Sequence, residues 1–155
     1  MGVHDQIDQQ PALGGLEDSL GFLLRICQLR VYEAFYERFG EDELRPGEFS
    51  VMWVIHLNPG IRQGVLAATL RIKAAQMTKM VRRLEEQDKI SREIPDDDRR
   101  SVRLTLTAMG ESFIADQQAA FFGNESYHNH PLPPAEAAEL ARLLRKYAGF
   151  AEAGA

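Results

Sequence analysis

The sequence predicts a mainly α-helical chain with one small β-wing, and three observations indicate this fold class. Apolar residues recur at three- and four-residue spacing over most of the 155 residues, which is typical of amphipathic helices. Proline and glycine pairs divide these stretches into short elements. Within 89–106, apolar and polar residues alternate instead, which predicts two short strands.

The composition fits a folded protein. Apolar residues make up 45% of the chain, which is enough for a core. No apolar run approaches the roughly 20 residues of a membrane span, and the first ten residues lack the apolar segment of a signal peptide. We therefore expect no membrane partner and a disordered tail at 1–14. A single cysteine, Cys27, excludes an internal disulfide and fits a reducing cytoplasm.

A long first helix is predicted from Leu16 to Phe39, with Gly40 as its stop. Its apolar residues occupy more than one side: Leu16, Leu20, Leu23, Leu24, Ile26, Cys27, Leu29, Val31, Tyr32, Ala34, Phe35 and Phe39. Such a surface is wider than one core-facing stripe needs, so it predicts packing against a second subunit.

Three shorter helices follow. Pro46 suits the first turn of a helix that runs to about Leu57. Further helices are predicted over 63–70 and 74–87, with a tight three-residue connection between them. Two short helices joined in this way form a helix-turn-helix.

A hairpin and two closing helices complete the chain. The strands 89–94 and 101–106 flank a charged turn, and a hairpin placed after a helix-turn-helix is a wing. Thr107 is a good N-cap for a fifth helix, whose end near Gly123 is not defined by the pattern, and Pro134 opens a last helix. The long terminal helices have no core of their own, which predicts burial against the same helices of a second copy.

The architecture expected is therefore a winged helix-turn-helix at 46–106. Dimerisation helices at 15–45 and 107–150 flank it, and the tail covers 1–14.

Charge is distributed unevenly. The net charge is −5, yet the 36 residues from Phe49 to Leu84 contain no Asp or Glu and six cations. Ten basic and seven acidic residues lie between Arg71 and Arg103, so that segment is positive and the rest of the chain is strongly negative. A basic face on an acidic body suits phosphate binding, although an ordinary solvated face is the alternative.

The predicted fourth helix has one apolar and one polar face. Its core-facing residues are Ala74, Met77, Val81 and Leu84. On the opposite face we expect base-edge contacts in the major groove from Ala75, Gln76 and Lys79. Phosphate contacts are expected from Arg82 and Arg83, and either role from Thr78. The alternative is a polar face that is solvated and binds nothing.

Further contacts are expected outside this helix. Arg62 and Lys73 precede two helices, where backbone N–H groups assist phosphate binding. In the wing turn we expect Arg99 to meet the minor groove or its phosphates. Arg100 also belongs to the DNA-binding segment, and Asp98 is expected to hold its guanidinium in a bidentate pair.

These motifs resemble the MarR family of bacterial regulators over roughly 16–150. The similar segments are 46–49, 53–55, 58–60, 66–67, 77–85, 98–101, 104–107, Gly110, 132–134 and the leucines Leu140, Leu143 and Leu144. Gly64-Val65 departs from the family pattern, in which an acidic residue is usual before the Leu-Ala pair. Gly123 is a second departure.

The resemblance implies a symmetric homodimer on palindromic double-stranded DNA. It also implies a repressor that is released when a small effector binds between the dimer helices and the DNA-binding lobe. An arginine near aromatic rings suits an aromatic acid or an aromatic acyl-CoA thioester. The candidate effector residues are Arg25, Arg30, Tyr32, Phe35, Phe49, Met52, Trp53 and His56. Plain core packing is the alternative for Phe49, Met52 and Trp53.

Other chemistry has little support in the sequence. There is no catalytic triad pattern, phosphate loop or dinucleotide motif, so we expect neither an enzyme nor a cofactor. Cys27 is expected to be a buried, inert thiol, and His128 and His130 match no zinc signature, so no metal site is expected. The alternative function is a winged-helix protein-interaction module without DNA binding, which has no need of a long acid-free stretch.

Overall fold

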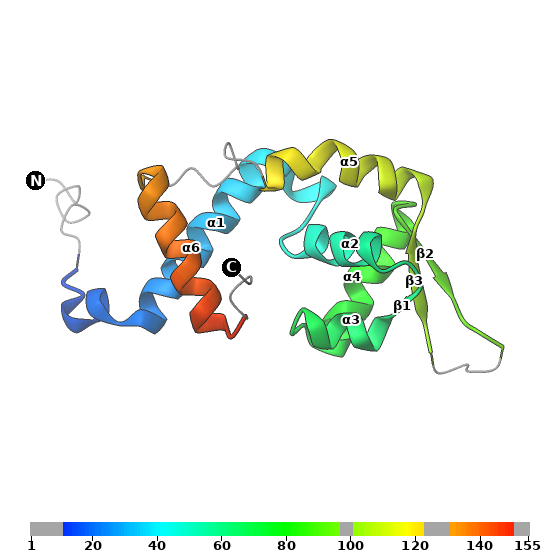
Figure 1. Ribbon diagram of the computed structural model, residues 1–155, viewed down its shortest axis with the longest axis horizontal. Helices are drawn as coiled ribbons and strands as arrows, with labels where there is room; N and C mark the ends of the chain where they lie inside the picture. Colours follow the sequence, from blue (N-terminus) through cyan, green and yellow to red (C-terminus); the bar gives the residue numbers. More distant parts are fainter. Residues whose placement is uncertain (1–10, 97–100, 123–130, 151–155) are drawn as a thin grey trace, which may run out of the picture.

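The computed structural model describes residues 11–96, 101–122 and 131–150. Its elements are η1 (Gly14–Asp18), α1 (Leu20–Glu43), α2 (Glu48–Leu57), β1 (Ile61–Arg62), α3 (Gln63–Thr69), α4 (Ala74–Glu86), β2 (Ile90–Glu93), β3 (Arg103–Leu106), α5 (Ala108–Phe122) and α6 (Pro134–Ala148). The molecule is elongated (Figure 1), with α1 and α6 at one end, the winged lobe of α2 to α4 and the sheet at the other, and α5 along one side. The predicted fold class is confirmed.

The boundaries of α1 differ slightly from the prediction. Ser19 has extended backbone angles, so the helix begins at Leu20 and a 3-10 turn precedes it. Gly40 breaks the helix as predicted, because its φ of 69° lies in the left-handed region that favours glycine.

The start of α5 agrees with the prediction. Thr107 caps this helix, since the Gly110 N–H donates to the Thr107 hydroxyl at 3.1 Å.

The antiparallel wing sheet contains a strand that the pattern did not predict. The strand order is β1-β3-β2, so β3 lies in the centre. Strand β1 has only two residues, too few to show alternation. Backbone bonds beside it, from the Gly60 N–H to the Leu104 carbonyl (2.8 Å) and from the Gln63 N–H to the Val102 carbonyl (2.9 Å), attach it to β3.

The core of the winged lobe joins α2, α3, α4, α5 and the sheet with the end of α1. Its members are Phe35, Phe39, Leu44, Phe49, Val51, Met52, Ile55, Leu66, Ala67, Met77, Met80, Val81, Leu84, Ile90, Leu104 and Ile114. The prediction that Ala74 faces this core is wrong. Ala74 is exposed because α4 begins there, one turn before Met77 first reaches the core, and Met80 is buried instead.

The other end of the molecule has no core within one chain. Helix α6 contains no buried residue. Large apolar side chains are exposed on η1, α1 and α6: Leu16, Leu20, Leu23, Leu29, Leu140, Leu143, Leu144 and Tyr147. Cys27 is exposed too, which corrects the expectation of a buried thiol. Among the described residues, no part of α1 before Phe35 is buried.

No helix in the described ranges is long and apolar enough to cross a membrane. The predicted tail at 1–14 and the uncertain end of the fifth helix near Gly123 fall largely outside the described residues.

Gly110 allows α5 to approach the start of β2. A Cβ atom at this position would lie 2.1 Å from the Lys89 carbonyl oxygen, which is backbone and cannot rotate away. We expect Gly110→Ala to lower the free energy of unfolding by about 2 kcal/mol or more. Urea denaturation followed by circular dichroism measures this.

The matched control is Gly64→Ala in α3. A Cβ there meets nothing within 4 Å, so this change should leave stability unchanged or raise it by up to about 1 kcal/mol. Equal losses in the two variants would contradict the close-approach explanation.

Candidate nucleic-acid interface

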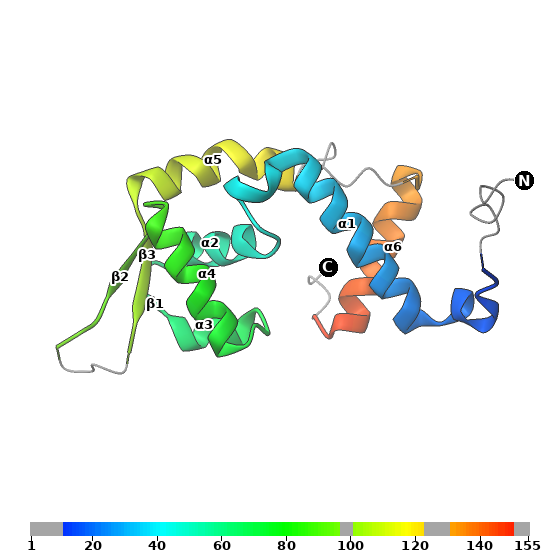
Figure 2. The same ribbon diagram turned by 180° about the vertical axis from the view of Figure 1, so that it is seen from behind.

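Because one face of α4 is buried in the core, its polar face points outward. Met77, Val81 and Leu84 are buried in the core. The residues predicted to read bases, Ala75, Gln76 and Lys79, are all exposed, as is Arg82. Seen from behind (Figure 2), α4 lies in front of α2 along the winged lobe. The helix therefore presents an alanine, an amide and long cations on one accessible surface, which suits the major groove.

Thr78 links the two helices of the helix-turn-helix. Its hydroxyl donates to the Ala74 carbonyl (3.0 Å) and accepts from the Gln63 amide (3.1 Å). Gln63 begins α3, so this contact sets how α3 and α4 meet. The Thr78 hydroxyl already has a donor and an acceptor in the protein, which favours a scaffolding role over the base or phosphate contact predicted for it.

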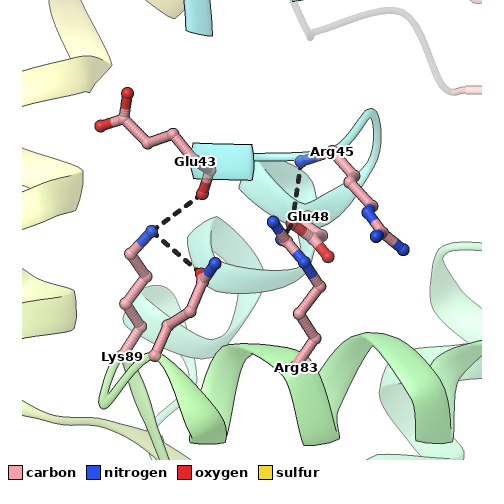
Figure 3. A network of polar contacts seen from close by, with 6 residues as sticks. Glu43, Arg45, Glu48, Arg83 and Lys89 are labelled. Atoms are coloured by element: carbon pink, nitrogen blue, oxygen red, sulfur yellow. Dashed lines mark hydrogen bonds and ion pairs between the residues drawn. The ribbon is translucent and has the colours of Figure 1, made fainter. Parts of the chain in front are cut away.

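Arg83 has a structural contact that the sequence did not suggest. Its Nη1 atom lies 2.5 Å from Glu48 Oε2, and its side chain is only 17% exposed. Glu48 is 1% exposed and also accepts from the Arg45 backbone N–H at 2.8 Å (Figure 3). We therefore correct the phosphate assignment of Arg83, because its guanidinium is used to neutralise a buried carboxylate on α2.

Arg82, the neighbouring residue, points into solvent. Its side chain is 75% exposed and pairs with Glu86 one turn later at 2.9 Å. Exposed pairs of this kind contribute little to stability and exchange readily. Arg82 therefore stays available for a phosphate.

Two arginines face each other across the base of the wing. Arg62 on β1 pairs in register with Arg103 on β3, and both side chains are exposed. Paired residues on antiparallel strands project from the same face, where like charges repel. Glu93 on β2 pairs in register with Arg103 from the other side, so one carboxylate lies beside the two cations. Neither arginine has an ion pair among the described residues, and the two positive charges exceed the one negative charge, so this face can still attract a phosphate. Arg103 was not among the predicted contacts, because its pairing with Arg62 depends on the unpredicted strand β1.

The remaining predicted DNA contacts are Lys73 and the residues of the wing turn. Lys73 is exposed at the start of α4. The wing is tied to α4 by an ion pair between Arg92 on β2 and Glu85, at 2.6 Å. Asp98, Arg99 and Arg100 lie outside the described residues, so their assignments stay predictions.

A cavity of about 310 Å³ lies between α1 and α4. Its lining residues are Tyr32, Tyr36, Arg45, Pro46, Glu48, Gln76, Lys79, Met80 and Arg83. Glu48 supplies a buried oxygen, Oε1, that has no hydrogen-bond partner in the protein. Two rings and two exposed cations thus line one half-open hollow, with the buried Glu48 carboxylate in its wall.

The structure brings some of the predicted effector residues together, since the Trp53 ring contacts those of Phe49 and His56, but it does not gather all eight around the cavity. Of the eight, only Tyr32 lines this cavity. Phe35, Phe49 and Met52 are buried in the core, which was the alternative given for two of them. Arg25 and Arg30 are exposed on α1 and do not line the cavity. The cavity between α1 and α4 therefore does not support the assignment of these eight residues to one pocket, which stays a prediction.

The remaining two predicted residues belong to the face between α2 and α5. Trp53 packs against the rings of Phe49 and Phe122, with centroid distances of 6.1 and 4.7 Å. His56 Nδ1 lies 2.6 Å from a carboxylate oxygen of Glu111 on α5. Both contacts hold α2 against α5.

The residues that do line the cavity carried only a weak sequence signal. Tyr36 lies one helical turn after Tyr32, and Arg45 lies in the connection before α2. The described residues contain no group of three or more side chains placed to hold a metal ion.

Comparison with known proteins identifies the family. A family model described as "MarR family" matches residues 44–102. A putative transcriptional regulatory protein for the hcr operon of Thauera aromatica is 30% identical over 134 residues, which cover 86% of this chain and 81% of that protein. The chain belongs to the MarR family. It is therefore a MarR-family transcriptional regulator and not an enzyme, and the interaction-module alternative loses its support.

Solved structures of transcriptional regulators have the same fold as this chain. The transcriptional repressor CouR, bound to a 23-mer DNA duplex, is 30% identical, with a TM-score of 0.78 over 90% of this chain and 99% of that chain. A probable transcriptional regulator from Pseudomonas aeruginosa is 26% identical, with a TM-score of 0.75 over 85% of this chain and 98% of that chain.

The two neighbouring arginines of α4 should differ strongly in their effect on stability. Arg83→Met leaves the Glu48 carboxylate buried without its cation, so we expect the free energy of unfolding to fall by about 2–4 kcal/mol. Arg82→Met removes only an exposed pair and should change it by less than about 0.5 kcal/mol. Urea denaturation of both variants measures the difference, and similar losses would argue against a structural role for Arg83.

Proposed function

We propose that this MarR-family chain acts as a homodimer that binds a palindromic operator and represses transcription until a small aromatic acid or aromatic acyl-CoA thioester releases it. One observation carries the proposal. Gln76 and Lys79, which lie on the exposed face of the proposed recognition helix α4, also line the cavity between α1 and α4. DNA and effector would therefore compete for the same two side chains.

The DNA arm of the proposal depends on local charge. The exposed cations Lys73, Lys79 and Arg82 lie on or beside α4, and the facing pair Arg62 and Arg103 lies at the base of the wing. Phosphate contacts from these residues would position the helix, and Ala75, Gln76 and Lys79 would read base edges. CouR, the repressor of known structure described above, is bound to a DNA duplex, which supports this arm.

The dimer arm depends on apolar surface. Proteins of the MarR family are dimers. In this chain, the exposed leucines of α1 and α6 form the surface that a second copy would bury. We assign 15–45 and 107–150 to dimerisation and 46–106 to DNA binding. The site of action is the compartment that holds the DNA, which for a bacterial regulator is the cytoplasm.

The effector arm depends on the chemistry of the cavity. Tyr32 and Tyr36 would pack against an aromatic ring. Lys79 or Arg45 would bind its carboxylate. A volume of about 310 Å³ accommodates one aromatic acid. The nucleotide part of a CoA thioester would lie outside it.

Release follows from a shift in population. A ligand that holds Lys79 and Gln76 in the cavity stabilises a conformation in which they are withdrawn from the groove. DNA affinity then falls by the ratio of the ligand's affinities for the two conformations. A ligand with equal affinity for both conformations would leave the DNA affinity unchanged.

The phosphate contacts are tested by the salt dependence of binding to non-specific duplex DNA. Each contact contributes roughly 0.9 to the slope of log affinity against log salt concentration. We expect Arg62→Ala and Arg103→Ala each to lower the magnitude of this slope by about one, and the double variant by about two. Fluorescence anisotropy over a salt series measures it.

The matched control is Arg142→Ala on α6, whose guanidinium pairs with Glu139 far along the chain from the wing. This change should leave the slope unaltered. A flat salt dependence in the wild type would instead favour a winged helix that does not bind DNA.

The effector site is tested by a thermal-shift screen of aromatic acids and their CoA thioesters, because a ligand stabilises the state that it binds. A compound that raises the melting temperature should also weaken DNA binding. Tyr36→Ala should weaken that compound's binding by about tenfold, the loss of one buried ring contact.

Leu57→Ala at the end of α2 is the control, since Leu57 is exposed, does not line the cavity and lies outside the proposed dimerisation helices. A compound that binds wild type and Tyr36→Ala equally well occupies another site. A compound that binds without altering DNA affinity is not an effector.

A further inference from the structure

Lys89 is an almost fully buried lysine at the point where three helices meet. It is 7% exposed. Its Nζ donates to the Glu43 carbonyl at the end of α1 and to the Gln87 side chain just after α4, both at 3.2 Å. The same ammonium stands 4.1 Å from the ring centroid of Phe113 on α5. Figure 3 shows the side chain reaching up to Glu43.

The backbone of Lys89 is held as firmly as its side chain. Its N–H donates to the Leu84 carbonyl of α4 at 2.9 Å, and its carbonyl accepts from the Thr107 N–H before α5 at 3.1 Å. The close approach of Gly110 fixes the same carbonyl from the other side. One residue is thus bonded to the ends of α1 and α4 and to the start of α5.

A buried ammonium is an expensive way to fill this space. Burial lowers the pKa of Lys89 below its usual 10.5, and the neighbouring carboxylates of Glu43 and Glu48 offset part of that effect. A methionine would fill the volume without this cost. Unlike a methionine, the ammonium makes directional hydrogen bonds. It therefore favours the arrangement of the surrounding helices in which its donors meet their acceptors.

The Arg83–Glu48 ion pair makes a second contact between the α4 region and the segment before α2. Arg83 on α4 binds Glu48, which also holds the Arg45 backbone (Figure 3). Both contacts attach the C-terminal half of α4 and the residues after it to the same short connection, 43–48, between α1 and α2. Two points of attachment fix the orientation of α4 relative to the 43–48 segment, which follows the Gly40 break in α1, whereas one point leaves a rotation free.

We propose that Lys89 is a positioning residue that sets the orientation of the recognition helix relative to α5 and to the segment that follows the Gly40 break in α1, and thereby the separation of the two recognition helices in the dimer. This inference goes beyond the proposed function and rests on its dimer and DNA arms. Paired recognition helices must match half-sites about 34–36 Å apart, so a small change of angle alters which half-site spacing is bound. Lys89 itself is buried, so we assign it no contact with DNA.

The test compares operators of different spacing. The wild type first selects its operator from a random duplex pool. Affinities are then measured for that duplex, for versions with one base pair added or removed between the half-sites, and for a single half-site. We expect the wild type to prefer its own spacing by about tenfold and Lys89→Met to reduce this preference to about threefold or less, with half-site affinity unchanged.

Two further variants make the result specific. Lys89→Arg keeps the charge and the donors, so it should restore most of the preference. Arg71→Met removes an exposed cation from the connection between α3 and α4, outside the proposed dimerisation helices, and should leave the preference as it is. An unspecific loss of stability would lower all affinities together and would leave their ratio intact, and that outcome in Lys89→Met would overturn the proposal.

A second measurement does not need DNA. In a Cys27→Ser background, which removes the only native thiol, Ala75→Cys places one spin label on α4 of each subunit. The distance distribution between the two labels should be about twofold broader, or displaced, in Lys89→Met. An unchanged distribution would overturn the proposal even if the wild type proved to bind no DNA, an outcome that would refute only the DNA arm.

If Lys89→Met does not fold, Phe113→Leu serves in its place, because it keeps the apolar packing of α5 and removes only the ring face beneath the ammonium. The same broadening and the same loss of spacing preference are expected, to a smaller degree. A wild-type distribution and preference in that variant would count against the proposal.

Discussion

The buried carboxylate of Glu48 is the constraint around which the winged lobe is arranged. It is 1% exposed at the start of α2 and takes its counter-charge from Arg83 on α4. Taking both charges out of water is costly, and breaking the pair would be costlier still because it leaves a charge buried alone. The recognition helix therefore cannot move away from α2 without either a new partner for Glu48 or water reaching it. The second oxygen of the same carboxylate is buried and has no hydrogen-bond partner among the described residues.

This arrangement divides the surface of α4 among three environments. Met77, Val81 and Leu84 face the core, Ala75 and Arg82 face outward, and Gln76 and Lys79 lie at the boundary with the cavity beneath α1. A 13-residue helix offers little room for separate surfaces, so the boundary residues belong to both the outward face and the cavity. Under the proposed function, that shared boundary would couple a small molecule in the cavity directly to the DNA contacts, without a long chain of intermediate movements.

Much of the fold could be predicted because it is encoded locally. Helical spacing placed α2, α3 and α4 within two residues of their ends, and Thr107 marked the start of α5. The wing strands showed their alternation. Features that depend on a distant partner could not be predicted in this way. Strand β1 exists only through its pairing with β3, and Arg103 gained its place beside Arg62 through that pairing. The effector residues could not be identified from the pattern for the same reason, since Phe49 and Met52 are as apolar in a core as in a pocket.

By itself, the sequence determined the order and type of the elements, the polar face of the recognition helix, and the basic stretch within an acidic chain, because periodicity, capping and charge are properties of neighbouring residues. Only the tertiary structure decided what the charged side chains do. Arg82 and Arg83 are adjacent and chemically identical, yet one is in solvent and the other neutralises a carboxylate 35 residues away. Lys89 is likewise one basic residue among many until folding places its ammonium against a carbonyl 46 residues earlier. Burial sets the strength of such interactions, and burial is fixed by the packing of the whole chain.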